Sequence, residues 1–355
     1  MSKRPKKPLK NRIFKILGLL IPAFLLYWIF AVKIPSEVSY QEIWTTITSL
    51  TLAENLILVL GGLLTIVTYG WTSAAVLPGL PLKQGTQSAV SGQLTSVILP
   101  APVDLAIRFS MYKSYGFSID KSTVAVTVAG IARYFIVFIM PVIGLGLMLV
   151  TGQGTSGYLT WFVLGTLLIL FALWFMKITL SSEKTAKKIG GILDKIVNKF
   201  LKLLKRKNRI DLVSVSVGFG KSTRGVAVDH FRSILLSNLV WGFSSFLVLF
   251  FAIRFVGIDS SVFSVSYIFL ITGMMLLFNA FPITPGGIGV TEALLITLIS
   301  FPSSEVQTAF MSAMFLYRIY TWLLPMPVGA VAYASWKKNN KTEIPNLSFK
   351  KDLKA

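Results

Sequence analysis

The sequence has no cysteine and only one histidine, His230, among its 355 residues. The absence of cysteine excludes disulfide bonds, thiolate metal sites and a cysteine nucleophile, and a single histidine argues against a multi-histidine metal site. Charged side chains are also scarce, since Asp, Glu, Lys and Arg together make up 14% of the chain. No residue pattern therefore indicates a metal, a cofactor or the catalytic groups of a soluble enzyme.

Hydrophobic residues are abundant instead. They make up 54% of the sequence, and the mean hydropathy is +0.71, well above that of a soluble protein. Uncharged runs of about 20 residues recur, which is the length that a helix needs to cross about 30 Å of hydrocarbon. We therefore predict an all-α polytopic membrane protein. The formal net charge of +21 suits an anionic membrane surface rather than nucleic acid.

The distribution of charge predicts the orientation of the spans. Residues 1–15 carry seven basic side chains and no acid, and residues 177–232 carry fourteen basic and four acidic ones. The positive-inside rule places both segments in the cytoplasm. The sequence predicts full spans at residues 16–32, 56–77, 123–150, 158–176 and 233–253, and a last span that ends near residue 336. We expect a multi-pass protein of the plasma membrane whose termini, including the basic tail at residues 337–355, are cytoplasmic.

The basic linker at residues 179–232 contains an amphipathic segment. Apolar residues recur there at spacings of three and four, namely Ile189, Leu193, Ile196, Phe200 and Leu204. Most of the lysines fall between these positions. We expect this segment to form a helix on the anionic lipids of the inner leaflet, with a solvated linker as the alternative. The linker separates a first transmembrane half at residues 16–178 from a second half at residues 233–336.

Two segments do not fit simple spans. Residues 83–117 are semi-polar and are interrupted at Leu99-Pro100-Ala101-Pro102, and residues 262–301 are apolar and are interrupted by prolines and glycines at residues 281–287. We expect each to be a re-entrant helical hairpin with a non-helical tip. The chain then has six full spans in an inverted repeat, a plan typical of transporters. If each arm of the second segment crosses the membrane, there are eight spans and the symmetry is lost.

Each break is followed by a lone arginine in an apolar span. Arg133 comes 31 residues after Pro102, and Arg318 comes 33 residues after Pro285. Burying such a charge costs several kcal/mol unless it is paired or lines a wet cavity. Because guanidinium groups match a phosphate bidentately, we expect Arg133 and Arg318 to converge on the phosphate of a lipid, with Arg108 as a further substrate-binding residue.

Two acidic residues, Asp104 and Glu292, belong to the same segments. In the alternative interpretation, Arg133 and Arg318 form ion pairs with these two acids and only hold the hairpins in place. Either acid is also a candidate for carrying a proton.

The stretch Pro285-Gly286-Gly287-Ile288-Gly289 lacks both the preceding strand and the Lys-Ser/Thr pair of a nucleotide-binding loop. We interpret it as a break between helices where the backbone approaches a ligand that a Cβ would block. The positive end of the following half-helix adds amide donors for an anion. Pro285, Gly286, Gly287 and Gly289 are therefore candidate substrate-binding positions.

Three features together resemble the transmembrane region of lysylphosphatidylglycerol synthases and its stand-alone flippase-like relatives. Residues 281–292 are similar to the family's Pro-x-x-Pro-Gly-Gly-x-Gly-x-x-Glu segment, residues 99–108 to its first-half proline and arginine element, and Arg133 and Arg318 match the arginine of its two following helices. The resemblance spans roughly residues 56–334. In the first half, residues 101–104 depart from the pattern, because members often carry Gly or Arg there.

The resemblance implies movement of a lipid with an anionic or modified head group between leaflets, the substrate being a phospholipid or a polyprenyl-phosphate lipid. Members that are fused to an aminoacyl-transferase domain make aminoacylated lipid. This sequence ends soon after its last span, so we expect neither a synthase nor another enzyme. The alternative is an intramembrane or accessory component of lipid-linked glycan synthesis or of head-group modification. The sequence leaves the lipid, the direction of transport, its energy source and the oligomeric state open.

Overall fold

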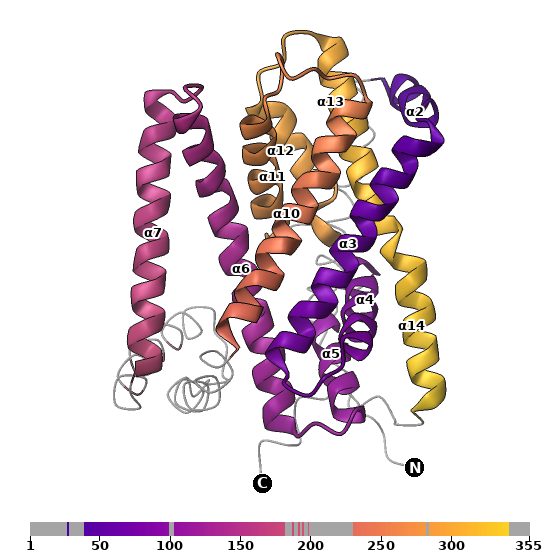
Figure 1. Ribbon diagram of the computed structural model, residues 1–355, viewed down its shortest axis with the longest axis vertical. Helices are drawn as coiled ribbons and strands as arrows, with labels where there is room; N and C mark the ends of the chain where they lie inside the picture. Colours follow the sequence, from indigo (N-terminus) through magenta and orange to yellow (C-terminus); the bar gives the residue numbers. More distant parts are fainter. Residues whose placement is uncertain are drawn as a thin grey trace, which may run out of the picture.

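The computed structural model describes residues 39–98, 103–181, 230–281 and 284–340, together with isolated helical positions at Tyr27, Lys187, Gly191, Asp194 and Asn198. The predicted span at residues 16–32, the amphipathic segment of the linker, the first proline break at residues 99–102 and the tail from residue 341 lie outside these ranges. Figure 1 shows the described helices as one elongated bundle, beside which one helix stands apart.

Four helices in the described part of the chain are long and apolar enough to cross a membrane. They are α3 (Leu52–Val76), α6 (Ile119–Val150), α7 (Ser156–Ser181) and α10 (Phe231–Phe255). Each one overlaps a span predicted from hydropathy. Large apolar side chains such as Trp161 and Leu168 of α7 are exposed on their surfaces, as expected of helices that face lipid. The prediction of an all-helical, multi-pass membrane protein is confirmed.

Short polar signals determine where these helices begin. Thr51 and Glu54 form a capping box at the start of α3, in which the Glu54 carboxylate accepts from the Thr51 amide at 2.7 Å. Ser118 caps α6, and Ser264 caps α11 (Val265–Asn279), each by accepting an amide N–H three residues further on. The caps satisfy backbone donors that have no partner within the helix.

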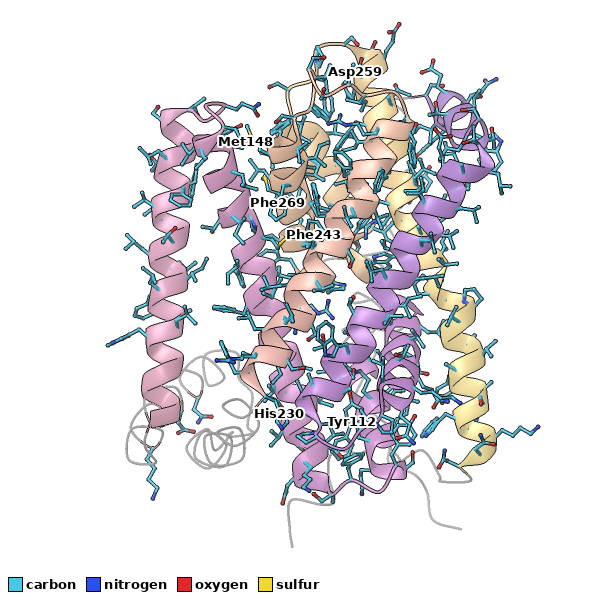
Figure 2. All side chains as sticks on the ribbon, in the orientation of Figure 1. Tyr112, Met148, His230, Phe243, Asp259 and Phe269 are labelled. Atoms are coloured by element: carbon cyan, nitrogen blue, oxygen red, sulfur yellow. The ribbon has the colours of Figure 1, made fainter. Side chains whose placement is uncertain are left out.

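The bundle has two distinct ends. Figure 2 places Tyr112 and His230 at one end, called here the lower end, and Met148 and Asp259 at the other, the upper end. The short helix α2 (Tyr40–Thr48) lies at the upper end, directly before α3. It buries Ile43 and leaves 69% of Trp44 exposed, so Trp44 is available as the interface anchor that its position in the sequence suggests.

Both interrupted segments consist of paired helices. The first pair is α4 (Leu82–Ile98) and α5 (Val103–Ser114). The second pair is α11 and α12 (Val290–Leu298), with the 3-10 turn η2 (Pro285–Gly287) between them. In Figure 1, α4 and α5 occupy the lower half of the bundle, and α11 and α12 the upper half. The pairs thus extend inward from opposite ends, and η2 at the second break contacts α4 of the first pair.

The last predicted span is a helix with an internal irregularity. It consists of α13 (Ser304–Arg318), the π-helical turn η3 (Ile319–Leu323) and α14 (Pro325–Asn339), and it runs from the upper to the lower end. Pro325 lacks the N–H that would continue the regular helix. A side chain of the first pair supplies a donor at this point, because Gln93 Nε2 of α4 binds the Thr321 carbonyl at 3.1 Å.

The two halves pack on each other reciprocally. At the centre α3 packs against α10, while α4 packs on α14 and α11 packs on α6. Each helix pair therefore contacts the helix that follows the pair of the other half, since α6 follows α4 and α5 and α14 belongs to the helix that follows α11 and α12. The α3–α10 contact includes polar bonds, from Trp71 Nε1 to Ser233 Oγ and from Thr72 Oγ1 to Ser237 Oγ, both at 3.1 Å. Such interhelical hydrogen bonds help to hold helices together in lipid.

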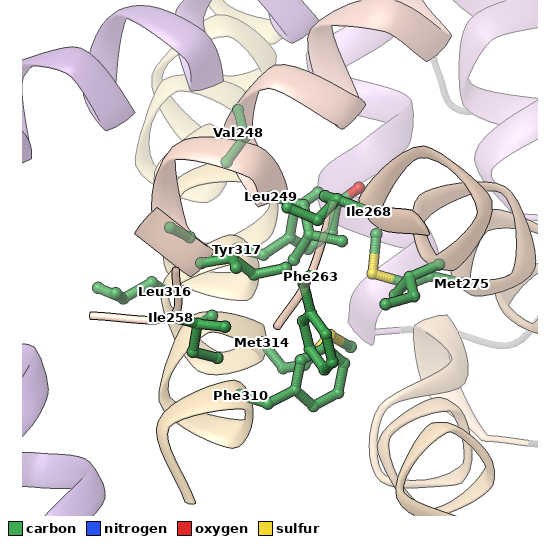
Figure 3. Packing of buried hydrophobic residues seen from close by; sticks show 14 of the residues in the cluster. Val248, Leu249, Ile258, Phe263, Ile268, Met275, Phe310, Met314, Leu316 and Tyr317 are labelled. Carbon is green, nitrogen blue, oxygen red and sulfur yellow. The ribbon is translucent and has the colours of Figure 1, made fainter. Parts of the chain in front are cut away.

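Hydrophobic clusters fill the space around each helix pair. The larger one joins α10, α11 and α13, and Figure 3 shows Leu249, Ile268, Phe310 and Met314 meeting within it. A second cluster joins α3, α5 and α6 at the lower end, and Tyr112 is completely buried in it.

The contact of α6 with α11 depends on glycine. A Cβ at Gly273 would come within 2.5 Å of the Pro141 nitrogen, whereas nothing lies within 4 Å of the corresponding position at Gly130 of α6. We predict that Gly273→Ala lowers the free energy of unfolding by about 1–3 kcal/mol through overpacking, and that Gly130→Ala does not lower it, since Ala favours the helix. Thermal unfolding in detergent compares the two variants. Equal melting temperatures would contradict this packing.

Candidate functional site

The tip of the second helix pair is a chain break stabilised by glycine. Gly286, Gly287 and Gly289 have φ angles of 62°, 69° and 82°, a region that other residues rarely adopt. Thr284 Oγ1 donates to the Ile288 carbonyl at 2.8 Å across the turn. A Cβ at Gly286 would also overlap the ring of Trp322 in η3. The candidate glycine positions therefore let the break pack tightly against the last helix.

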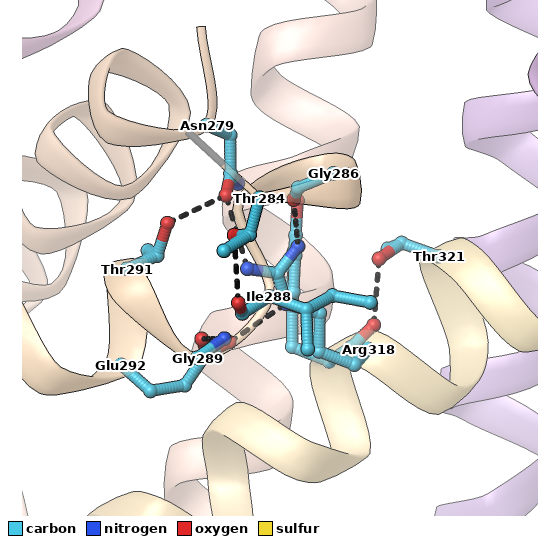
Figure 4. A network of polar contacts seen from close by, with 10 residues as sticks. Asn279, Thr284, Gly286, Ile288, Gly289, Thr291, Glu292, Arg318 and Thr321 are labelled. Atoms are coloured by element: carbon cyan, nitrogen blue, oxygen red, sulfur yellow. Dashed lines mark hydrogen bonds and ion pairs between the residues drawn. The ribbon is translucent and has the colours of Figure 1, made fainter. Parts of the chain in front are cut away.

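Arg318 fastens this tip to α13 through three bonds (Figure 4). Its Nε donates to Glu292 Oε1 at 2.8 Å, its Nη1 to the Gly286 carbonyl at 3.1 Å and its Nη2 to Asn279 Oδ1 at 3.0 Å. The guanidinium also lies over the ring of Trp322, with its Cζ 5.1 Å from the ring centroid. All three nitrogens of Arg318 are thus occupied by the protein itself.

Glu292 completes the pair on the other side. Its Oε2 accepts from the Gly289 amide at 2.7 Å, as in a capping box at the start of α12. Both charges are buried, with exposed side-chain fractions of 3% for Glu292 and 8% for Arg318. Each ionised group therefore has a charged partner as well as neutral ones, which a buried ion pair requires. Of the two ion pairs in the alternative interpretation, this one is present, and the site around Arg318 is neutral.

Arg108 of α5 has a different environment. It is 3% exposed, and among the described residues its guanidinium is hydrogen-bonded to three hydroxyl groups: those of Tyr69 at 3.2 Å, Ser73 at 3.0 Å and Tyr112 at 3.4 Å. Its Cζ also lies 5.1 Å from the centroid of the Tyr69 ring. Its Nε is buried without a hydrogen-bond partner. The stem of the side chain passes Gly92 of α4, where a Cβ would come within 2.9 Å of it. The packing of α4 on α5 thus positions the buried Arg108 guanidinium next to Tyr69.

Arg133 of α6 approaches Tyr69 from the other side. Its Cζ lies 4.3 Å from the centroid of the Tyr69 ring and 3.6 Å from that of Trp241 in α10. The guanidinium is therefore bound to both aromatic faces by cation–π interactions. Its Nη2 is buried without a hydrogen-bond partner. Arg133 makes no ion pair with Asp104 or any other acid within the described ranges.

Tyr69 therefore joins two cations. Its hydroxyl binds Arg108 while its ring contacts Arg133, and the two arginines lie within electrostatic range of each other. Asp104 stands one turn before Arg108 on α5 and also lies within electrostatic range of it, but it makes no ion pair in the described structure. We call Tyr69, Arg108 and Arg133 the Tyr69 cluster. Its unpaired nitrogens are donors that can bind an anion.

The structure thus distributes the sequence-predicted residues over two places. Arg318, Glu292 and the glycines gather at the second tip, whereas Arg108 and Arg133 meet at Tyr69. The sequence predicts that Arg133 and Arg318 converge on one ligand. In the described structure their convergence is limited to Tyr317, which lies within electrostatic range of both arginines. The sequence analysis missed Tyr69, Trp241 and Asn279. Asn279, as a polar residue at the end of an apolar run, carried a usable signal; aromatic residues are too common in this chain to stand out.

No group of three His, Asp or Glu side chains lies close enough to hold a metal ion in the described part of the chain. What the two places offer chemically is therefore hydrogen-bond donors, positive charge and aromatic faces.

We predict that Glu292→Gln lowers the free energy of unfolding by about 3 kcal/mol or more, because it leaves the Arg318 cation buried without its charged partner. The double variant Glu292→Gln/Arg318→Gln should lose less than the sum of the single losses, since neither unpaired charge remains. Asp104→Asn is the control, because Asp104 is partly exposed and unpaired in the described structure. Melting temperatures in detergent test this, and additive losses would disprove the coupling.

No curated protein matches the sequence. The family model described as the lysylphosphatidylglycerol synthase TM region matches residues 15–329, a range that includes both helix pairs and Arg108, Arg133 and Arg318. The chain therefore belongs to the lysylphosphatidylglycerol synthase transmembrane-region family.

Proposed function

We propose that the protein moves a lipid with an anionic, phosphate-bearing head group between the leaflets of the membrane. The observation that carries this proposal is the Tyr69 cluster, in which two arginines at membrane depth contact hydroxyl and aromatic groups but no carboxylate of the described residues. A cation that has no charged partner at such a depth is costly and typically marks a substrate or ion pathway. The family supplies the connection to membrane lipid.

The arrangement of the helices supports transport. Two helix pairs extend inward from opposite ends, and each packs on the helix that follows the pair of the other half. We propose that both are re-entrant hairpins in an inverted repeat of six full spans. Broken helices that meet near the midplane are how many transporters bring backbone groups to a substrate, and rocking of one half against the other changes the side from which it is reached.

Exposed charges at the two ends support the proposed orientation. The lower end carries Lys83, Lys113, Lys121, Arg232, Lys337 and Lys338 against the single exposed acid Asp120 among the described residues, and the upper end carries Glu42, Glu54, Asp259 and Glu305. By the positive-inside rule, the lower end faces the cytoplasm of a plasma-membrane protein, and both termini follow it. Each Lys or Arg near an anionic leaflet contributes about 1 kcal/mol of attraction, so inner-leaflet lipids are proposed partners of this end and of the basic linker.

Transport fits the site better than catalysis does. The buried carboxylate of Glu292 already accepts from Arg318 and from the Gly289 amide, so general acid–base chemistry would require both bonds to break. The proposed activity is therefore non-enzymatic, in contrast to a role in lipid-linked glycan synthesis or head-group modification.

A vesicle assay tests the proposal. Purified protein is reconstituted with fluorescent phosphatidylglycerol or fluorescent phosphatidate in separate preparations, and movement is followed by chemical quenching of the outer leaflet. We predict that the wild type moves at least one of these lipids and that Arg108→Gln and Arg133→Gln reduce the rate about tenfold or more, since each removes a charge-assisted donor.

The matched control is Lys113→Gln, which removes one positive charge from the exposed end of the same helix as Arg108. This variant should move lipid at the wild-type rate. Wild-type protein that moves neither lipid faster than empty vesicles do, or arginine variants that remain fully active, would refute the proposed function.

Labelling of introduced cysteines tests the topology, because the chain has no cysteine of its own. Ser260→Cys and Ser304→Cys, at the exposed ends of the second helix pair, should both react with an impermeant maleimide from outside. Lys83→Cys and Lys113→Cys, which flank the first pair, should react only from the cytoplasmic side. Labelling of Ser260→Cys and Ser304→Cys from opposite sides would mean that the arms cross the membrane separately.

A further inference from the structure

We infer that the Tyr69 cluster binds a phosphate monoester, the terminal phosphate of a lipid, in preference to a phosphate diester. The inference rests on the proposed function and narrows its substrate class. It separates lipids that end in a phosphate group, such as phosphatidate or a polyprenyl monophosphate, from lipids such as phosphatidylglycerol, whose phosphate is esterified on both sides.

Charge is the first argument. The cluster contains the guanidinium groups of Arg108 and Arg133, and neither is hydrogen-bonded to a carboxylate of the described residues. A monoester carries between one and a half and two negative charges near neutral pH, as a phosphorylated side chain does, whereas a diester carries one. Asp104 lies within electrostatic range of Arg108 but makes no ion pair in the described structure, so one carboxylate offsets at most part of the two positive charges. A monoester therefore neutralises more of the positive charge of the Tyr69 cluster than a diester does.

The number of donors is the second argument. Arg108 Nε and Arg133 Nη2 are both buried and have no partner, and the hydroxyls of Tyr69, Tyr112 and Ser73 surround the Arg108 guanidinium. A monoester offers three terminal oxygens as acceptors, and a diester offers two. A head group with more terminal oxygens satisfies more of these donors, and an unsatisfied buried donor is costly.

Tyr69 and Trp241 fix where the phosphate can bind. Both rings pack closely on the Arg133 guanidinium, whose Cζ lies 4.3 Å from the centroid of Tyr69 and 3.6 Å from that of Trp241. The edge of a guanidinium is the part that donates to phosphate oxygens in a fixed fork. The aromatic rings thus orient Arg133 without neutralising it.

Arg318 is not part of this site. Its three nitrogens are bonded to Glu292, Asn279 and the Gly286 carbonyl, and its charge is cancelled by Glu292. A phosphate at Arg318 would meet a cation that Glu292 already neutralises, whereas no described carboxylate is paired with the arginines of the Tyr69 cluster. We therefore assign one phosphate site to the molecule, in its first half.

Binding measurements on the full chain test the assignment. Purified protein in an uncharged detergent is titrated with short-chain phosphatidate, phosphatidylglycerol and phosphatidylcholine, and with inorganic phosphate as the head group without a lipid. We expect phosphatidate to bind about tenfold or more tightly than phosphatidylglycerol and phosphatidylcholine to bind weakest. Tighter binding of inorganic phosphate than of phosphatidate would assign the site to a free anion and overturn the lipid assignment.

Variants locate the preference within the molecule. Arg108→Gln and Arg133→Gln should abolish the preference for the monoester, and Tyr69→Phe, which keeps the ring, should reduce it while the protein remains folded. Lys113→Gln removes an exposed charge of the same sign and should leave the preference unchanged, as should Arg318→Gln measured below its melting temperature. A preference that survives Arg133→Gln, a preference that Tyr69→Phe leaves undiminished, or equal wild-type affinity for phosphatidate and phosphatidylglycerol would overturn the inference.

The inference and the proposed function fail separately. Transport of lipid by a protein that binds monoester and diester equally would overturn only the substrate class. A monoester preference centred on Arg108 and Arg133 in a protein that moves no lipid in vesicles would support the site and overturn transport.

Discussion

The energetic cost of a guanidinium group at membrane depth constrains the whole structure. Each buried arginine must be compensated, paired or reached by water, and the chain deals with this cost in two ways. Arg318 is compensated by Glu292 and by the oxygens of the broken α11–α12 segment. Arg108 and Arg133 are held by hydroxyl and aromatic groups, which lower the cost of burial without cancelling the charge.

The same low-polarity environment governs the backbone at the second break. A chain that leaves helical geometry inside a membrane exposes amides and carbonyls, and these are tolerated only where protein or a wet cavity satisfies them. Thr284 supplies a donor to the Ile288 carbonyl, Glu292 supplies an acceptor to the Gly289 amide, and Arg318 supplies a donor to the Gly286 carbonyl. The primary role of these side chains is therefore structural, because they satisfy the backbone groups that the break leaves without helical partners.

The sequence predicted the membrane class, the spans now seen as α3, α6, α7 and α10, and the two interrupted segments, because hydropathy and proline–glycine breaks are local properties. It also singled out every buried arginine of the two candidate places, because a lone charge in an apolar run is visible without a structure. Partners were harder to predict. Arg133 meets Tyr69 and Trp241, which are far from it in sequence, and one-dimensional spacing does not show which of 26 Phe, 11 Tyr and 8 Trp residues a cation will contact.

A near-symmetric arrangement with unequal charge has a mechanistic consequence. If both halves carried compensated arginines, neither would attract an anion. If Arg318 were also uncompensated, three cations would bind the same head group and hold it too tightly for release. A cation held by neutral aromatic and hydroxyl groups keeps its attraction for a ligand, yet loses no ionic partner when the ligand leaves. The neutral tip around Arg318 then does not bind the head group. The half that contains Arg108 and Arg133 can move its ligand past this tip.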